Sequence, residues 1–477
     1  MRILFFVFIF ITNVLNAKVR LPHLISDHMI LQQDSNVRLW GWGTPEKEIC
    51  VNVSWSNNVY KTYVNENGRW EVMVKTPSAS YTPLHITFDD GDKITLNHIL
   101  SGEVWICGGQ SNMEMTMKGF PACPIEGYLE EVLAANKTHG IHFVDIPRNE
   151  AAFPQEDVEC QWKAVNAQTV ADCSAVGYFF ATKLNKELNV PVGLILANKG
   201  GTAVECWLNQ ENIRKHTMEP FEIAEIRKKY DEALYGFRPM LCWNGILAPV
   251  ISYTVRGMLW YQGCANVGHF NEEYADRLKL FINQCRAVSG NHLLPFGLVE
   301  IAPFDYGWVK DRLAASKIRE SQHRVSLDIS NCGFVSTNDL VYSYEHKQIH
   351  PAKKKEIGLR LAYWALNEQY GIKELPYKNM QFEEMRIEDG KCYLKFENTY
   401  GGLNRWEDIQ GFEVAGADRV FHPADAFYDW RQELVISAPA VPFPVAVRYC
   451  FKDFQTGNVK NAAGLPLIPF RTDDWLY

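Results

Sequence analysis

The sequence predicts an α/β protein with a parallel sheet flanked by helices and an accessory β-sandwich region at each end. At 477 residues the chain is too long for one ordinary core, which indicates two or three domains. Strands alternate with helical stretches in the middle of the chain, a pattern that favours a parallel sheet covered on both faces. Short strands separated by turn residues occupy both ends. We therefore expect a leader at 1–17, β-rich regions at 18–100 and 372–477, and an α/β unit at 101–371.

The leader has the composition of a cleavable signal peptide. Arg2 supplies a positive charge, residues 3–11 are an apolar run, and the small residue Ala17 ends the segment. That run is too short to span a bilayer, and no later stretch reaches about 18 uninterrupted apolar residues. We therefore expect a protein without a membrane span that enters the secretory pathway and is lysosomal or secreted.

Other features of the sequence fit the same compartment. All twelve cysteines follow the leader, and their even number is compatible with disulfides. Asn52 and Asn136 begin acceptor sequons for N-glycosylation.

The net charge is −8 and the longest basic run is three lysines, which argues against a nucleic-acid partner.

The β-rich region at the N-terminus is predicted from short segments of alternating or β-branched residues. Residues 37–42, 51–55 and 70–74 read as strands, and turn-forming residues such as those at 65–68 separate them. Strands at this spacing are typical of a small sandwich.

The central unit alternates between the two kinds of element. Residues 176–184 and 272–285 read as helices, and residues 192–197, 257–261 and 296–301 read as buried strands. In the tail, residues 393–396, 434–437 and 445–449 read as strands again, which predicts the second β-rich region.

Ser111 stands at a position suited to chemistry. It follows the apolar strand 104–107 and the pair Gly108-Gly109, which allows a tight turn with positive φ. The carboxyl end of a strand is where α/β sheets form their ligand crevices. A serine there can expose its hydroxyl while its own amide N–H faces the pocket. The segment is not a Gly-x-Ser-x-Gly elbow, because Met113 replaces the second glycine.

His350 is the second candidate. Pro351 suits the first turn of a helix that runs through Trp364 and ends near Gly371. His350 would then lie at the entrance of this helix, where the positive end of the helix dipole disfavours the imidazolium and keeps the ring able to accept a proton. His346 lies four residues earlier, but Lys347 stands where a metalloprotease motif has glutamate, so we expect no metal site.

Four blocks, in order, resemble those of the sialate O-acetylesterase family of SGNH-type serine hydrolases, and the similarity covers nearly the whole chain after the leader. The first is Gly109-Gln110-Ser111-Asn112-Met113-Glu114, and the second is Asn198-Lys199-Gly200-Gly201-Thr202. The third, Trp260-Tyr261-Gln262-Gly263-Cys264-Ala265-Asn266, has cysteine and alanine where the family usually has glutamate and serine. The fourth contains Ile349-His350-Pro351 and continues to Leu361.

The resemblance implies roles for these residues. Ser111 would be the nucleophile and His350 the general base. A glycine of the second block, Gly201 before Gly200, would join the Ser111 amide in the oxyanion hole. Asn266 and Gln262 would add side-chain N–H donors, since amides donate without titrating.

The third member of the catalytic group stays open at this point. Many relatives have aspartate two residues before the histidine, and here that position is Gln348. Glutamine accepts the imidazole N–H but cannot neutralise an imidazolium. Asp339, which matches an aspartate of relatives, and Glu345 are candidates, and a Ser–His dyad is the alternative.

The resemblance thus implies a cofactor-independent esterase that removes acetyl groups from sugar hydroxyls, with O-acetylated sialic acid as the expected substrate. Two other interpretations remain. One is the same chemistry on another acetylated carbohydrate. The other is a glycan-binding homologue weakened by the changes at Cys264 and Gln348, although retention of both Ser111 and His350 argues against it.

Overall fold

The computed structural model describes residues 18–216, 239–269, 272–404, 407–431 and 433–475. The signal peptide expected at 1–17 lies outside the described residues. The central sheet has the strand order β13-β12-β11-β7-β10-β8-β9. Its strands are parallel except β9, which is antiparallel to β8. They are β7 (Lys93–Gly109), β8 (Ile141–Asp145), β9 (Trp162–Ala164), β10 (Val192–Asn198), β11 (Gly257–Tyr261), β12 (Phe296–Val299) and β13 (Cys332–Val335).

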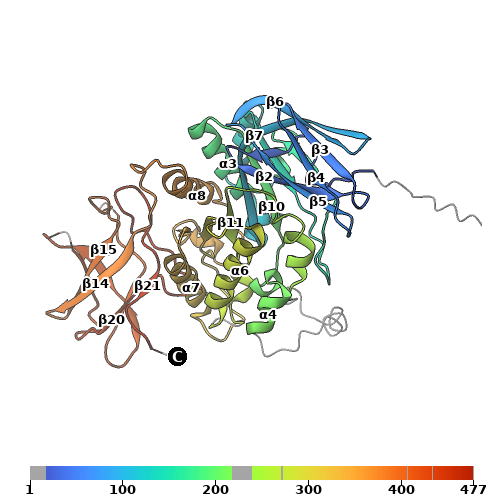
Figure 1. The fold of residues 1–477 in the computed structure, drawn as a ribbon. Helices are drawn as coiled ribbons and strands as arrows, with labels where there is room; N and C mark the ends of the chain where they lie inside the picture. The colour runs from blue at the N-terminus through green and yellow to red at the C-terminus, as the bar shows by residue number, and fades with distance from the viewer. Residues whose placement is uncertain (1–17, 217–238, 270–271, 405–406, 432, 476–477) are drawn as a thin grey trace, which may run out of the picture.

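Helices cover both faces of this sheet (Figure 1). Successive residues of β7 alternate between two cores: Val104 and Ile106 pack with α6 and α7, whereas Trp105 and Cys107 pack with α3 and α8. Burial of both faces explains why the strand is apolar without alternation. The helices of the central unit are α1 (Ser111–Glu114), α2 (Tyr128–Ala135), α3 (Ala175–Leu188), α4 (Gln210–His216), α6 (Tyr274–Ser289), α7 (Ala314–Asp328) and α8 (Lys355–Glu368).

The N-terminal unit is continuous with the central sheet through β7. Up to Ser101 this 17-residue strand pairs antiparallel with β6, and from Glu103 it pairs with β10. The expected boundary at 100/101 therefore falls inside one strand, at the point where its partners change. The other strands of this unit are β1 (Ile30–Gln32), β2 (Asn36–Trp42), β3 (Glu48–Val53), β4 (Val59–Tyr63), β5 (Arg69–Lys75) and β6 (Ser80–Asp89).

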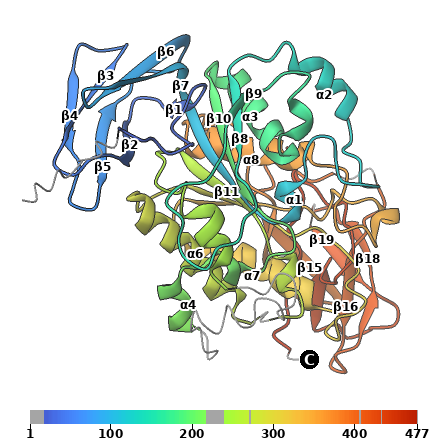
Figure 2. The same ribbon diagram turned by 90° about the vertical axis from the view of Figure 1, so that its right-hand side faces the viewer.

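The C-terminal unit consists of two four-stranded antiparallel sheets that share one core. In both views the central unit lies between it and the N-terminal unit (Figures 1 and 2). Its strands are β14 (Gln381–Glu388), β15 (Lys391–Glu397), β16 (Phe412–Ala415), β17 (Phe421–Pro423), β18 (Asp425–Tyr428), β19 (Leu434–Ser437), β20 (Ala446–Tyr449) and β21 (Phe470–Arg471).

This architecture confirms the predicted fold class: a mostly parallel central sheet flanked by helices, with separate antiparallel sheets towards both ends. One helix boundary was wrong. The helix expected to begin at Pro351 begins at Lys355, so residues 351–354 form an irregular segment before it.

Three smaller observations bear on the sequence predictions. Within the described ranges, no helix is long and apolar enough to cross a membrane. Asn52 and Asn136, the sequon asparagines, are both exposed. All twelve cysteines lie in described residues, and the structure has each of them as a free thiol.

Candidate active site

The sheet register brings the first three sequence blocks to one edge. Gly109 at the end of β7 pairs with Asn198 at the end of β10 and with Tyr261 at the end of β11. The residues that follow, including Ser111, therefore leave the sheet side by side at its carboxyl edge. The chain places β8, β9 and β10 on one side of β7 and then crosses over to place β11, β12 and β13 on the other, so this edge is the switch point at which doubly wound folds bind their ligands.

Gly109 is required at the turn that presents Ser111. Its φ is +132°, and a Cβ there would lie 2.2 Å from the Tyr261 carbonyl oxygen. The next residue, Gln110, donates its amide to that same carbonyl at 2.9 Å. Helix α1 then begins at Ser111, and this residue is partly exposed. The turn therefore places Ser111 at the carboxyl edge of the sheet, with part of the residue open to solvent.

A buried asparagine joins the first block to the fourth. Asn112, directly after Ser111, donates its side-chain amide to the carbonyl of Ile349 at 2.9 Å. Ile349 directly precedes His350, so the fold brings Ser111 and His350 to one site although 239 positions separate them. No hydrogen bond joins the Ser111 hydroxyl to the imidazole in the described part of the chain, as is common before a substrate is bound.

The second block lies against Ser111. A Cβ on Gly200 would be 3.3 Å from the Ser111 Cβ. The Gly200 amide donates to the Glu114 carboxylate at 2.5 Å, and Arg148 contacts that carboxylate at 3.0 Å. Gly201 has a φ of +69°, and its amide N–H has no acceptor among the described residues. Of the two glycines, Gly201 is therefore the one with an N–H available for a ligand.

The imidazole of His350 is held neutral by its surroundings. Burial, followed by the positive charge of Lys354, lowers the pKa of His350 to about 4. Its Nε2 atom is buried and has no partner within the described ranges, and its ring packs edge-on against Phe120. The pKa is low for this reason and not because of a helix dipole, since α8 begins five residues later. The ring can therefore accept a proton at neutral pH.

No carboxylate orients this imidazole in the described residues. Asp339 forms a two-pronged ion pair with Arg360 at 2.7–2.8 Å and contacts Lys460 at 3.2 Å. Burial opposes ionisation of Asp339, but the two cations outweigh it and hold the pKa of the carboxyl below its ordinary value. Glu345 accepts the backbone amides of Tyr342 and Ala352. These contacts do not support Asp339 or Glu345 as the catalytic acid.

Gln348 also contacts the backbone and not the ring. Its side-chain oxygen accepts the His350 amide at 3.1 Å, and its side-chain nitrogen lies 3.0 Å from the Cys123 sulfur. Glutamine here stabilises the loop that carries the histidine. In the described part of the chain, none of Asp339, Glu345 and Gln348 makes a hydrogen bond to the His350 ring.

The amides of the third block are used within the protein. Gln262 donates to the Thr202 carbonyl at 3.1 Å and to Asn266 at 2.8 Å, and Asn266 donates to the Glu205 carboxylate at 3.0 Å. Glu205 is also paired with Arg277, and the side chains of Gln262 and Asn266 are completely buried. The expected role of Gln262 and Asn266 in the oxyanion hole is not supported by these contacts, which instead fix the second block to the third.

Lys354 is a site residue that the sequence analysis did not single out. Its side chain is completely buried, donates to the Asn112 side chain at 2.7 Å, and lies 5.9 Å from the centre of the Tyr261 ring. Burial lowers the pKa of Lys354 to about 7. No carboxylate contacts it among the described residues, and the nearby position that holds glutamate in the resembling family is the buried Cys264. In the sequence, Lys354 has the helical spacing of the apolar residues Ile357 and Leu361, and this spacing could have indicated that the lysine is buried.

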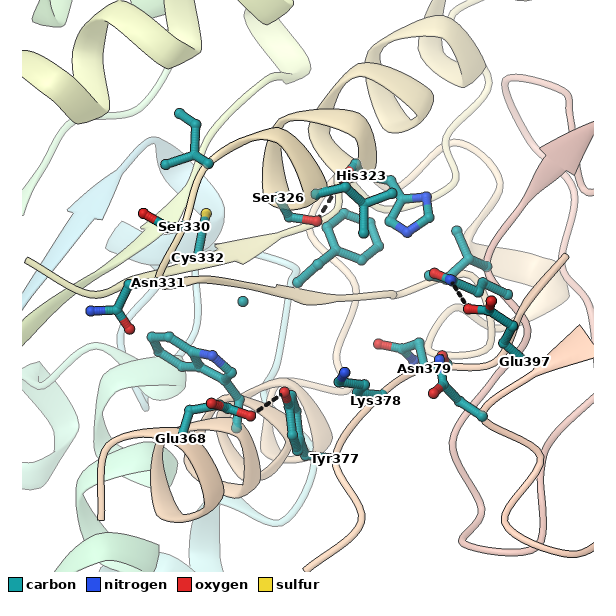
Figure 3. A pocket seen from close by; sticks show the side chains of 18 residues that line it. His323, Ser326, Ser330, Asn331, Cys332, Glu368, Tyr377, Lys378, Asn379 and Glu397 are labelled. Atoms are coloured by element: carbon teal, nitrogen blue, oxygen red, sulfur yellow. Dashed lines mark hydrogen bonds between the residues drawn. The ribbon is translucent and has the colours of Figure 1, made fainter. Parts of the chain in front are cut away.

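A separate cavity of about 440 Å³ lies away from this site (Figure 3). It is lined by Ser330, Asn331 and Cys332 at the amino end of β13, and by residues of α8 and the C-terminal unit. Because Ser111 is at the carboxyl edge of the same parallel sheet, this cavity is on the opposite edge and is not part of the active site.

Comparison with known proteins defines the class and then the family. A family model described as carbohydrate esterase, sialic acid-specific acetylesterase, matches residues 101–367. Sialate O-acetylesterase of Mus musculus is 23% identical, with 94% of each chain covered, and that of Homo sapiens is 22% identical, covering 77% of this chain and 74% of the relative. The structure of a carbohydrate acetylesterase from Xanthomonas citri superposes with a TM-score of 0.84 at 29% identity, covering 96% of this chain and all of that one.

Fold, site and matches together define a carbohydrate esterase that acts on acetylated sugars. Within that class, the chain belongs to the sialic acid-specific acetylesterase family, and the predicted resemblance is confirmed.

Proposed function

We propose that this protein removes O-acetyl groups from sialic acids by Ser–His catalysis through an acetyl-enzyme. The observation that carries the proposal is the hydrogen bond between Asn112 and the Ile349 carbonyl, because it ties the segment bearing Ser111 to the segment bearing His350. The neutral imidazole supports the role of base, and so does its Nε2 atom, which has no partner among the described residues.

In the first step the Ser111 hydroxyl attacks the acetyl carbonyl and gives its proton to His350. The negative oxygen that develops is held by the amide N–H groups of Ser111 and Gly201, neither of which has an acceptor in the described residues. Collapse of this intermediate breaks the ester bond, and His350 returns the proton to the departing sugar hydroxyl.

Water completes the cycle. His350 removes one proton from the water molecule as it attacks the acetyl-enzyme and passes that proton to the Ser111 oxygen as the bond breaks. Acetic acid leaves with the other proton of the water and ionises to acetate in solution. The reaction needs no cofactor. The proposed mechanism assigns no third catalytic group, because the side chains of Asp339, Glu345 and Gln348 are all engaged in other contacts.

The sialic acid preference and the compartment are part of the same proposal. The substrate class is supported by the family description and by the relatives, which carry the name sialate O-acetylesterase. The composition of residues 1–17 supports entry into the secretory pathway, with a lysosomal or secreted destination, and exposure of Asn52 and Asn136 is compatible with glycosylation there.

Labelling with a serine-directed fluorophosphonate, followed by peptide mapping, tests the nucleophile. We expect modification at Ser111 and a fall in acetyl-ester turnover of at least about 10⁴-fold in Ser111→Ala. Ser343→Ala is the matched control, since Ser343 is exposed in the 3-10 turn η5 (Ser343–Glu345) that precedes His350 in the chain. Labelling at another serine, or turnover retained in Ser111→Ala, would refute the assignment. Faster release of acetate from acetylated xylose than from O-acetylated sialic acid would refute the substrate.

A further inference from the structure

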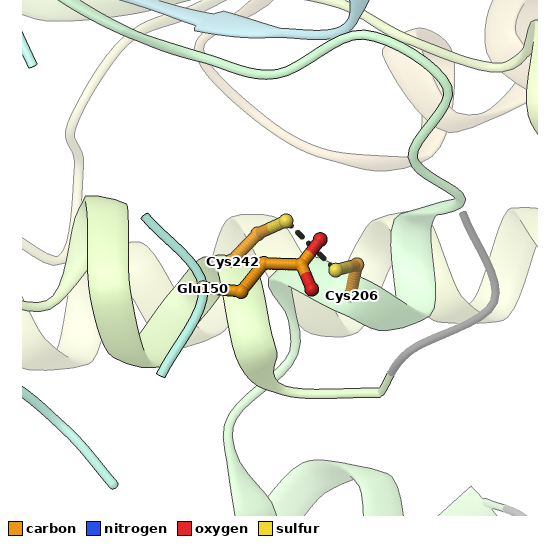
Figure 4. A group of neighbouring side chains, drawn as sticks. All are labelled: Glu150, Cys206 and Cys242. Atoms are coloured by element: carbon orange, nitrogen blue, oxygen red, sulfur yellow. Dashed lines mark hydrogen bonds between the residues drawn. The ribbon is translucent and has the colours of Figure 1, made fainter. Parts of the chain in front are cut away.

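Two buried cysteines of the central unit are in direct contact. Cys206 lies in the turn η2 (Val204–Trp207), four residues after Thr202, and Cys242 directly precedes the π-helical turn η3 (Trp243–Leu247). Their sulfur atoms are 2.7 Å apart (Figure 4). Both side chains are completely buried. The esterase mechanism uses neither of them.

The distance between the sulfurs separates two explanations. Two thiolates on one tetrahedral zinc, each about 2.3 Å from the metal, would lie about 3.8 Å apart. A disulfide joins its sulfurs at about 2.05 Å. At 2.7 Å the sulfurs of Cys206 and Cys242 are too close to share a metal, and a small movement brings them to bonding distance.

The third residue of the cluster, Glu150, also argues for a disulfide. The Glu150 carboxylate lies beside the two sulfurs (Figure 4), within 4.8 Å of both. Lys199 contacts this carboxylate at 3.5 Å, so its charge already has a counter-ion. Burial, with Glu150 as a further cause, raises the pKa of the Cys242 thiol well above its ordinary value. Both sulfurs are therefore neutral thiols in the reduced chain, and joining them as a disulfide adds no charge to this buried position.

We propose that Cys206 and Cys242 form a disulfide bond in the mature enzyme. Two S–H bonds break and one S–S bond forms, and the two electrons and two protons pass to a disulfide oxidant such as glutathione disulfide, which becomes two thiols. Supply of that oxidant in the cell rests on the secretory location that is part of the proposed function.

The bond would support the active site by fixing the loop that carries Gly201. Glu205, the neighbour of Cys206, accepts hydrogen bonds from Asn266 and Arg277, and its carbonyl accepts the Met240 amide at 3.1 Å. A disulfide at 206–242 therefore holds the loop that carries Gly201 against η3. We expect reduction to loosen this loop and to lower kcat for acetyl-ester hydrolysis.

Mapping of the bond uses the full chain, secreted from cells and digested without reduction after alkylation of free thiols with iodoacetamide in guanidinium chloride. We expect a linked peptide pair containing Cys206 and Cys242, with zinc content well below one per chain. Recovery of both residues as alkylated cysteines, or one zinc per chain that is lost in Cys206→Ser, would overturn the proposal.

A second measurement keeps the test independent of secretion and of esterase activity. Purified protein is equilibrated with glutathione buffers, and its thermal unfolding is followed in each. We expect reduction to lower the Tm of the wild type and of the control Cys285→Ser, whose thiol is buried elsewhere in α6, but not that of the double variant Cys206→Ser/Cys242→Ser. An equal fall in all three proteins would refute the bond, whereas loss of esterase function alone would leave it standing.

Discussion

Replacement of Lys354 by methionine should stabilise the protein near neutral pH. The fall in the pKa of Lys354 from 10.5 to about 7 corresponds to about 5 kcal/mol, at about 1.4 kcal/mol per unit. This is the free energy by which burial disfavours the ammonium. Methionine has a similar length and carries no charge, so that cost disappears. The Asn112 oxygen loses its donor, which costs about 1–3 kcal/mol. The net stabilisation is therefore about 2–4 kcal/mol at pH 7.

The pH dependence gives the effect its signature. Below pH 7 both the folded and the unfolded chain hold the proton on Lys354, and the full cost is present. Between about 7 and 10.5 the unfolded chain keeps the proton while the folded chain has lost it, so the stability of the wild type rises with pH. We expect the advantage of Lys354→Met to shrink by about 2 kcal/mol between pH 7 and pH 9.

Urea unfolding of both proteins across pH 6–9.5 measures this difference. Other groups titrate equally in the two proteins, so the quantity of interest is the difference between their unfolding free energies at each pH. Lys347→Met, on an exposed position of the nearby loop, is the control and should show no such trend. A difference that stays constant with pH, or a variant less stable at pH 7 than at pH 9 relative to the wild type, would refute the reasoning.

Three further outcomes follow from the site. The acid limb of kcat/KM should have an apparent pKa of about 4, because activity requires neutral His350. Lys354→Met should raise this apparent pKa by removing a positive charge near the ring, and pH–rate profiles of the two proteins measure the difference. Asp339→Asn should lose about 3–5 kcal/mol of stability, since it leaves Arg360 and Lys460 without their carboxylate. The folded variant should retain kcat/KM, and a large loss of kcat would instead support Asp339 as the catalytic acid. Gly109→Ala should yield little soluble protein in an expression assay, because its Cβ would collide with the Tyr261 carbonyl.

The sequence predicted the architecture because its signals were local. Residues 192–197 and 257–261 are apolar runs of strand length, and they appear as β10 and β11 within one residue. Glycine pairs after such strands marked the turns of the site. These features depend on neighbours along the chain, which a single sequence displays.

Partners across the fold were less predictable. Gln262 and Asn266 can hold an oxyanion by chemistry, but their donors meet Thr202 and Glu205, which tertiary packing alone decides. The sequence likewise left Asp339 as a candidate carboxylate, but Arg360 pairs with it from a helix 21 positions away. The start of α8 was misplaced because Pro351 is compatible with a first turn but does not require one.

The uninterrupted path of β7 from the N-terminal unit to Gly109 has a practical consequence for dissecting this enzyme. Removal of the first hundred residues would strip β1 and β6 from the near half of that strand, leave unsatisfied amides and carbonyls there, and expose apolar side chains now packed in a shared core. The hydrolase is therefore best treated as inseparable from its β-rich neighbour, and shortened versions should aggregate before they can be assayed.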